Sequence, residues 1–193
     1  AIPSGATLLV AAELSDIPEP KPLTIKRPKG IPEHSTQTTY YYSDDQWVIR
    51  FQWEDSSKPK GYDKTFRQYN RLPDGTVEMK KGDRPWMAYR LNEVLAHIND
   101  VEVPAVLWGE GEKCVEIPRS ECILSLTLQG SSWSKADIVR SLEPIAKANS
   151  QCVQVFIADT DATGEKKAKT FSDACAEVGL PCLVISPAMF EVE

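Results

Sequence analysis

Long apolar runs are missing from this sequence. No stretch approaches the ~18 consecutive apolar residues of a membrane-spanning helix, and residues 1–12 lack the basic flank and apolar core of a signal peptide. We therefore expect a cytoplasmic protein with no membrane partner. Of the 193 residues, 41% are hydrophobic and 26% are charged, which is enough for one full domain and a smaller module.

Zinc ligands are also scarce. The cysteines are odd in number and form no Cys-x-x-Cys pair, and only two histidines accompany them. A structural zinc site uses closely spaced sets of such ligands, so we expect none here. We expect the thiols to be reduced and to lie among apolar core residues. They are Cys114, Cys122, Cys152, Cys175 and Cys182.

The net charge of −6 hides an uneven distribution. Residues 47–90 hold ten basic and six acidic side chains, whereas residues 91–193 hold eight basic and sixteen acidic ones. A basic segment beside an acidic one suits a metal-dependent enzyme that acts on a phosphate-rich substrate. Solvated surface charge without a partner is the alternative interpretation.

The first half of the chain divides into an arm and a small module. Residues 1–37 are expected to form an extended, proline-rich arm, because residues 16–32 contain five prolines; a short helix could occupy residues 6–14. Residues 38–100 are expected to form a small β-rich, basic module that ends in a short helix. The expected elements are strands at 38–42, 47–53 and 65–70, a turn at 73–75 and a helix at 91–98.

Alternating strands and helices characterise residues 101–193. The strands are short and continuously apolar, which is typical of a parallel sheet covered on both faces. We therefore predict an α/β domain with a mainly parallel four-stranded sheet between helices. The expected strands are 105–108, 122–128, 153–158 and 182–185, and the expected helices are 135–148, capped by Ser134, and 165–178, ended by Gly179.

Three carboxylates follow two of these strands. Glu110 comes after the strand that ends at Trp108, and Asp159 and Asp161 come after the strand that ends at Ala158. Ligands of open parallel sheets bind at the carboxyl ends of the strands, and hard oxygen ligands suit Mg²⁺. The alternative is that the two aspartates only cap the helix that follows.

Three motifs, in this order, resemble the Toprim domain of topoisomerases and primases. Residues 106–113, VLWGEGEK, resemble its glutamate motif, and residues 156–164, FIADTDATG, resemble its Asp-x-Asp motif, with residues 126–130 as the strand and glycine turn between them. The resemblance covers roughly residues 103–186. It implies a compact Rossmann-like fold, a general acid or base at Glu110, and Mg²⁺, or Mn²⁺, held by Asp159 and Asp161 with Glu110. It also implies nucleotide contacts at Lys113, Gly130 and Gly164, although Lys113 could equally be a solvated helix residue.

The preceding segment is similar to the strand-rich lead-in of phage and plasmid primase-like proteins. The similarity rests on residues 42–44, 64–68, 73–75 and 89–91. Such proteins often join a Toprim unit to a helicase. The implied function is primase-like nucleotidyl transfer in the replication of a mobile element, with a single-stranded DNA template, nucleotides and a helicase as partners.

Two departures from the family pattern keep other functions open. Cys114 stands where an aspartate commonly follows the glutamate motif, and Gly130 lacks the usual flanking glycines. A catalytically degenerate module that binds nucleic acid or protein is therefore an alternative, as is a nuclease that uses the same carboxylates to cut phosphodiesters.

Basic and aromatic side chains are interleaved in the lead-in segment. They could form a surface on which bases stack and phosphates pair, or the aromatics could fill the core of the small sheet. The aromatics are Trp47, Trp53, Tyr69 and Trp86, and the basic residues are Arg67, Arg71, Lys80, Lys81 and Arg84.

Overall fold

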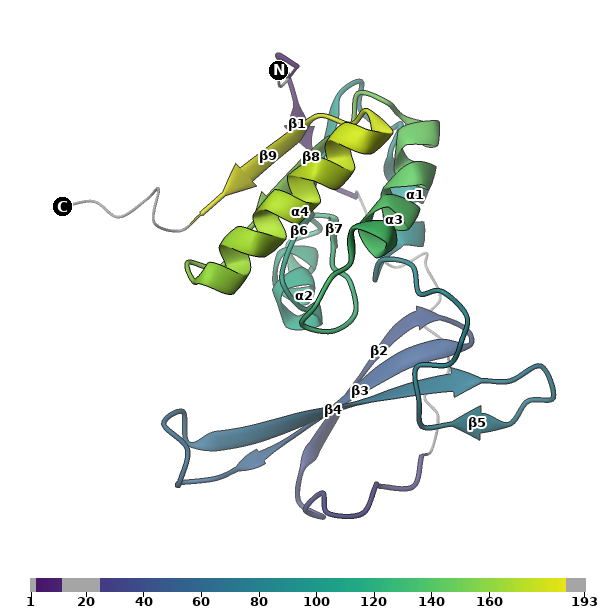
Figure 1. Ribbon diagram of the computed structural model, residues 1–193, viewed down its shortest axis with the longest axis vertical. Coiled ribbons are helices and arrows are strands. Elements are labelled where there is room, and N and C mark those ends of the chain that lie inside the picture. The colour runs from purple at the N-terminus through teal and green to yellow at the C-terminus, as the bar shows by residue number, and fades with distance from the viewer. Residues whose placement is uncertain (1–2, 12–24, 187–193) are drawn as a thin grey trace. The chain divides into compact units, whose positions relative to one another are not determined.

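The computed structural model describes residues 3–11 and 25–186 and divides the chain into two compact units (Figure 1). The described residues of the α/β unit are 3–11 and 86–186, and those of the antiparallel unit are 25–85. Residues 12–24 of the expected proline-rich arm lie outside the described residues.

A parallel sheet of five strands forms the centre of the α/β unit. All its strand pairs are parallel, as the apolar strands predicted. The sheet has five strands instead of the expected four, because Thr7–Leu8 pairs with Pro104–Ala105. One edge of β6 pairs with β8, and its other edge is shared by β1 near its start and β7 near its end. The strands are β1 (Thr7–Leu8), β6 (Pro104–Trp108), β7 (Ser125–Leu126), β8 (Val153–Ile157) and β9 (Cys182–Ile185).

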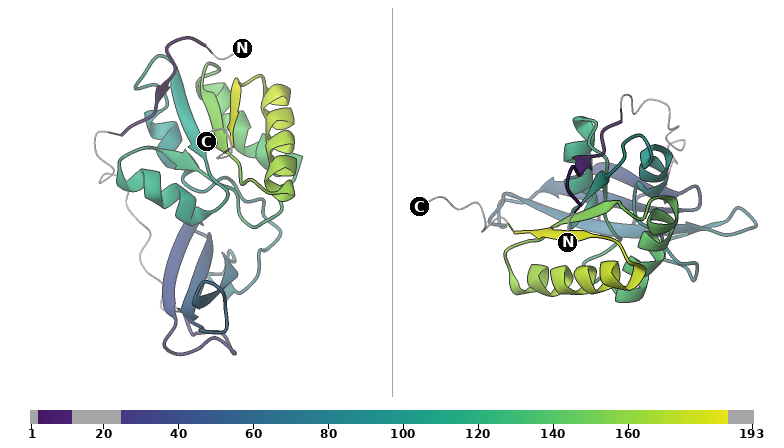
Figure 2. Two further views of the ribbon diagram at one scale, coloured as in Figure 1. Left: turned by 90° about the vertical axis from the view of Figure 1, so that its left-hand side faces the viewer. Right: turned by 90° about the horizontal axis from the view of Figure 1, so that it is seen from above.

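Helices lie on both faces of this sheet (Figure 2). Helices α3 (Lys135–Ala148) and α4 (Ala162–Val178) pack against each other and cover the face that carries Val106, Trp108 and Phe156. On the opposite face α2 (Glu112–Ser120) packs beside β7, where the Ser125 hydroxyl donates to the Val115 carbonyl at 3.0 Å. The expected position of the sheet between helices is therefore confirmed.

The antiparallel unit is a four-stranded sheet in the order β2-β3-β4-β5. Alternate residues of β3 point into a core of Trp47, Ile49 and Phe51, with Tyr69 and Ile31 packed on them. The predicted turn at residues 73–75 is present, because Leu72 N donates to the Thr76 carbonyl at 2.8 Å. The strands are β2 (Thr36–Ser43), β3 (Gln46–Glu54), β4 (Tyr62–Arg71) and β5 (Val77–Glu78).

Some elements differ from the sequence-based expectation. The helix expected from residue 6 is wrong, because Thr7–Leu8 pairs with β6 as a strand. The strand expected at 122–128 is reduced to Ser125–Leu126. Ile123 and Thr127 form only isolated bridges, with Val10 and Tyr89, and Cys122 lies outside the strand with a positive φ of 60°. The short helix α1 (Leu91–His97) belongs to the α/β unit instead of the β-rich module, because its apolar face lies in the core of that unit.

Candidate functional site

Glu110 and Asp159 meet at the carboxyl ends of two neighbouring strands. Trp108 of β6 pairs in register with Phe156 of β8, so the residues that follow each strand emerge side by side. The backbone N–H of Asp159 donates to Oε1 of Glu110 at 2.9 Å. The topology thus brings together two of the three predicted carboxylate residues.

Lys167 neutralises Glu110. Its ammonium forms an ion pair with Oε2 of Glu110, and both side chains are only 10% exposed. The same ammonium lies 5.3 Å from the centroid of the Trp133 ring, within the range of a cation–π contact. Sequence reasoning missed this role of Lys167, because several lysines line α4 and their spacing does not show which one turns toward β6.

Asp161 caps α4. Its Oδ1 accepts a hydrogen bond from the N–H of Gly164 at 2.8 Å, which satisfies one of the unpaired donors at the start of the helix. The capping interpretation is therefore correct for this oxygen. Asp159 precedes the cap and is exposed.

Gly164 allows the acidic loop to pack on the first turn of α4. A Cβ at this position would lie 2.2 Å from the carbonyl oxygen and 2.8 Å from the carbonyl carbon of Asp159. Those are backbone atoms that cannot rotate away. The glycine is thus required by this close approach, and the structure gives it a packing reason independent of nucleotide contact.

The two other residues expected to contact nucleotide, Lys113 and Gly130, lie on different elements from the acidic loop. Lys113 is exposed in the first turn of α2. Gly130 has a φ of +82° in the loop before α3, and its carbonyl accepts from the indole N–H of Trp133 at 3.2 Å. Gly130 therefore helps to place the Trp133 ring, which lies beside Lys167.

Carboxylate oxygens fit Mg²⁺ chemically. Within residues 3–11 and 25–186, however, no group of three or more histidine, cysteine, aspartate or glutamate side chains is arranged to hold a metal ion. Both carboxylate oxygens of Glu110 accept a hydrogen bond, one from the Asp159 N–H and the other from the Lys167 ammonium.

The basic residues expected to contact nucleic acid lie in the antiparallel unit, and three of them form ion pairs there. Arg84 lies 2.9 Å from one oxygen of Asp45, and Arg71 lies 3.9 Å from the other. Lys80 lies 3.0 Å from Glu78. The local positive charge is therefore partly neutralised.

Two of the interleaved aromatics lie in the core of the small sheet, as the alternative interpretation predicted, whereas Trp86 belongs to the other unit. Trp47 and Tyr69 are buried and stack with ring centroids 5.9 Å apart, and Trp86 is buried in the α/β unit. Trp53 is half-buried. Of the remaining basic residues, Arg67 pairs with Ile49 across the strands, on the face of the sheet that carries Trp47 and Tyr69. Arg67 donates to the Thr65 hydroxyl at 2.7 Å, whereas Lys81 is exposed.

A buried charge network links α1 to α2. Glu93, whose side chain is 3% exposed, lies 2.7 Å from Arg90 and 2.8 Å from Arg119. Glu116 pairs with Arg90 at 3.0 Å and accepts from the Tyr89 hydroxyl at 2.8 Å, and burial raises the pKa of Tyr89. The network fixes the direction of α2, which begins just after Glu110.

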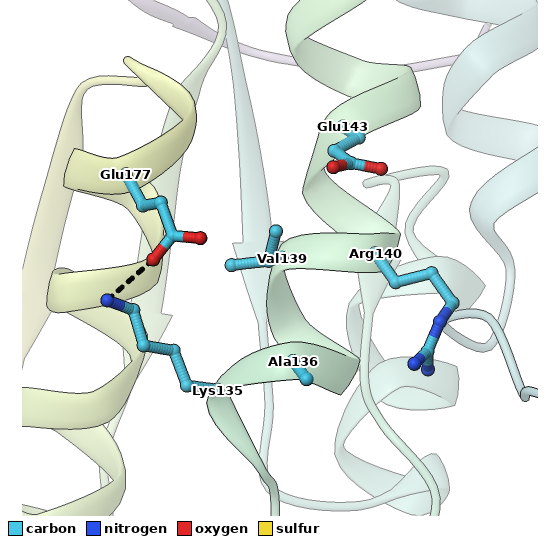
Figure 3. A pocket seen from close by; sticks show the side chains of 6 residues that line it. All are labelled: Lys135, Ala136, Val139, Arg140, Glu143 and Glu177. Atoms are coloured by element: carbon cyan, nitrogen blue, oxygen red, sulfur yellow. Dashed lines mark ion pairs between the residues drawn. The ribbon is translucent and has the colours of Figure 1, made fainter.

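A hollow of about 450 Å³ lies between α3 and α4 (Figure 3). In it Lys135 and Glu177 form an ion pair at 2.7 Å across the two helices. Glu177 stands near the end of α4, whereas the acidic loop precedes its start. The lining residues, none of which was predicted as a site residue, are Lys135, Ala136, Val139, Arg140, Glu143 and Glu177.

In the part of the chain that the structure describes, no helix is both long and apolar enough to span a membrane. In comparisons with known proteins, no family model, curated protein or solved structure matches the chain.

Proposed function

We propose that the α/β unit is a Toprim-type, Mg²⁺-dependent catalytic domain that carries out primase-like nucleotidyl transfer. The observation that supports this most is the hydrogen bond between the Asp159 backbone and Glu110 across the carboxyl ends of two adjacent parallel strands. It places an acidic loop and a second carboxylate at the edge where open α/β sheets bind their ligands.

Each residue of this edge has a role in the proposed reaction. Asp159 and Asp161 would hold Mg²⁺, or Mn²⁺, together with Glu110. The bound cation supplies charge neutralisation for a triphosphate and favours ionisation of a 3′-hydroxyl. Glu110, oriented by the Asp159 N–H, would accept the hydroxyl proton as that oxygen attacks the α-phosphorus and pyrophosphate departs.

The proposed partners follow from the same reaction. They are a single-stranded DNA template, nucleotides and a helicase domain or protein. The proposed location is the cytoplasm, and the proposed process is the replication of a mobile element. In the α/β unit, Lys113, Gly130 and Gly164 are the proposed contacts to nucleotide. The exposed Lys80 and Lys81, with Arg67, Arg71 and Arg84, are the proposed contacts to template.

Primer synthesis tests the proposal. Wild-type protein should extend primers on a single-stranded template with nucleotides and Mg²⁺, and Asp159→Asn should lose this activity. Asp159 is exposed and precedes the cap, so the substitution should leave folding unchanged. Nicking of supercoiled DNA without primer synthesis would instead identify a nuclease that uses the same carboxylates.

A non-catalytic binding module is the second candidate. The ion pair between Lys167 and Glu110 favours it, because this pair neutralises the carboxylate without any metal, and the departure at Cys114 agrees with it. A binding module should hold single-stranded DNA equally well before and after Mg²⁺ is chelated. A catalytic domain that binds its substrate through Mg²⁺ should instead lose affinity for single-stranded DNA when Mg²⁺ is chelated.

A further inference from the structure

Glu110 has a positively charged partner already in place. One carboxylate oxygen accepts from the Asp159 backbone at 2.9 Å, and the other from the Lys167 ammonium. Since the side chains of Glu110 and Lys167 are both only 10% exposed, water screens this pair poorly. A divalent cation bound to Glu110 would meet the repulsion of the ammonium at close range.

From this arrangement we infer that Lys167 is a built-in counter-ion that competes with a divalent cation for Glu110. The inference rests on the proposed function, because it assumes that the cation binds at this edge of the sheet. Lys167 neutralises Glu110 while the metal is absent and must release it when the metal binds. It therefore weakens metal affinity and sets the cation concentration at which the site is occupied.

The position of Lys167 supports an exchange of partners. Its ammonium also lies over the face of Trp133 at 5.3 Å from the ring centroid, so leaving Glu110 does not remove all favourable contacts. Glu110 also accepts from the backbone N–H of Asp159 in the acidic loop. A cation bound jointly by that loop and Glu110 would therefore lie close to Lys167, which contacts the same carboxylate.

The same helix offers a matched control. Lys169 stands two residues later and pairs with Asp173 at 3.1 Å, but its side chain is 78% exposed. Removing the charge of Lys169 changes the net charge of the protein by the same amount. Because solvent screens an exposed charge, it should hardly change metal binding.

The experiment is a calorimetric titration of Mn²⁺ into the wild-type chain, Lys167→Met and Lys169→Met. We expect Lys167→Met to bind Mn²⁺ on the order of tenfold more tightly, the size of a typical coupling between two binding events. Lys169→Met should stay within about twofold of wild type, as expected for a screened charge. Lys167→Arg, which keeps the charge, should also stay close to wild type.

Folding is checked by circular dichroism, since Lys167→Met leaves Glu110 without its ion pair. Should that variant not fold, Lys167→Gln replaces it, because an amide can still donate to Glu110 without carrying charge; the same tighter binding is expected. Suppose that folded Lys167→Met and Lys167→Gln bind Mn²⁺ with the same affinity as wild type, while Asp159→Asn loses binding. This result would overturn the role of Lys167 and would still support the metal site. Absence of Mn²⁺ binding in every folded protein, also with a non-hydrolysable nucleoside triphosphate present, would overturn both.

Discussion

Replacing Gly164 by alanine should destabilise the α/β unit. The added Cβ would lie 2.2 Å from the carbonyl oxygen of Asp159, more than 1 Å closer than an ordinary van der Waals contact of about 3.5 Å. Overpacking of this kind costs about 1–3 kcal/mol, and the upper part of that range applies because the opposing atoms are backbone. Alanine regains up to about 1 kcal/mol through its higher helix propensity. The net loss in the free energy of unfolding is therefore about 2 kcal/mol.

Urea denaturation followed by helical circular dichroism measures this loss, because the helices of the described residues all lie in the α/β unit. Thr163→Ala is the control: it is the neighbouring, exposed helical position, and its stability should stay within about 0.5 kcal/mol of wild type. If Gly164→Ala proved as stable as wild type or more stable, helix propensity alone would govern this position and the proposed close approach of Asp159 would be refuted.

Three further changes test other parts of the structure. Asp161→Ala should lower the free energy of unfolding by about 1 kcal/mol through loss of the helix cap, whereas Asp161→Asn, which still accepts the cap hydrogen bond, should stay near wild type in the same denaturation assay. Glu93→Ala should cost about 3 kcal/mol, because the half-buried Arg90 and Arg119 lose the buried carboxylate that both contact and keep only Glu116 as a common partner. A loss below about 0.5 kcal/mol would show that these charges interact only as strongly as an exposed ion pair. Burial raises the pKa of the Cys152 thiol from about 9 to about 12. Between these pH values the thiol is ionised in the unfolded chain but still protonated in the folded one. The free energy of unfolding should therefore fall as the pH rises from 9 to 12, by at most about 1.4 kcal/mol per pH unit. Cys152→Ala should show a shallower fall in a pH series of unfolding curves, and identical slopes would contradict the assigned cause.

The sequence predicted the elements whose signals are local. Helix α3 begins at Lys135 after the Ser134 cap and ends at Ala148, as expected from the capping residue and the apolar spacing. The end of α4 was also predicted, because Gly179 adopts the left-handed conformation that ends helices. The parallel sheet followed from the apolar strands alternating with these helices.

Features that depend on distant residues were not predictable. Thr7–Leu8 becomes a strand only through pairing with β6, nearly a hundred residues later, and nothing in its own short segment specifies that partner. The pairing of Lys167 with Glu110 needs the register of β6 and β8 together with the rotation of α4. The aromatics of the antiparallel unit show the same limit, since period-two spacing marks an apolar face without showing whether that face is covered.

Titration of Mg²⁺ and Mn²⁺ into wild type and into Asp159→Asn/Asp161→Asn, with and without a non-hydrolysable nucleoside triphosphate, tests the central claim most directly. The asparagines keep the backbone and the helix cap while removing both negative charges. We predict saturable binding by wild type that is lost in the double variant. Unchanged binding in the double variant, or no binding by folded wild type with nucleotide present, would contradict a metal site at these strand ends.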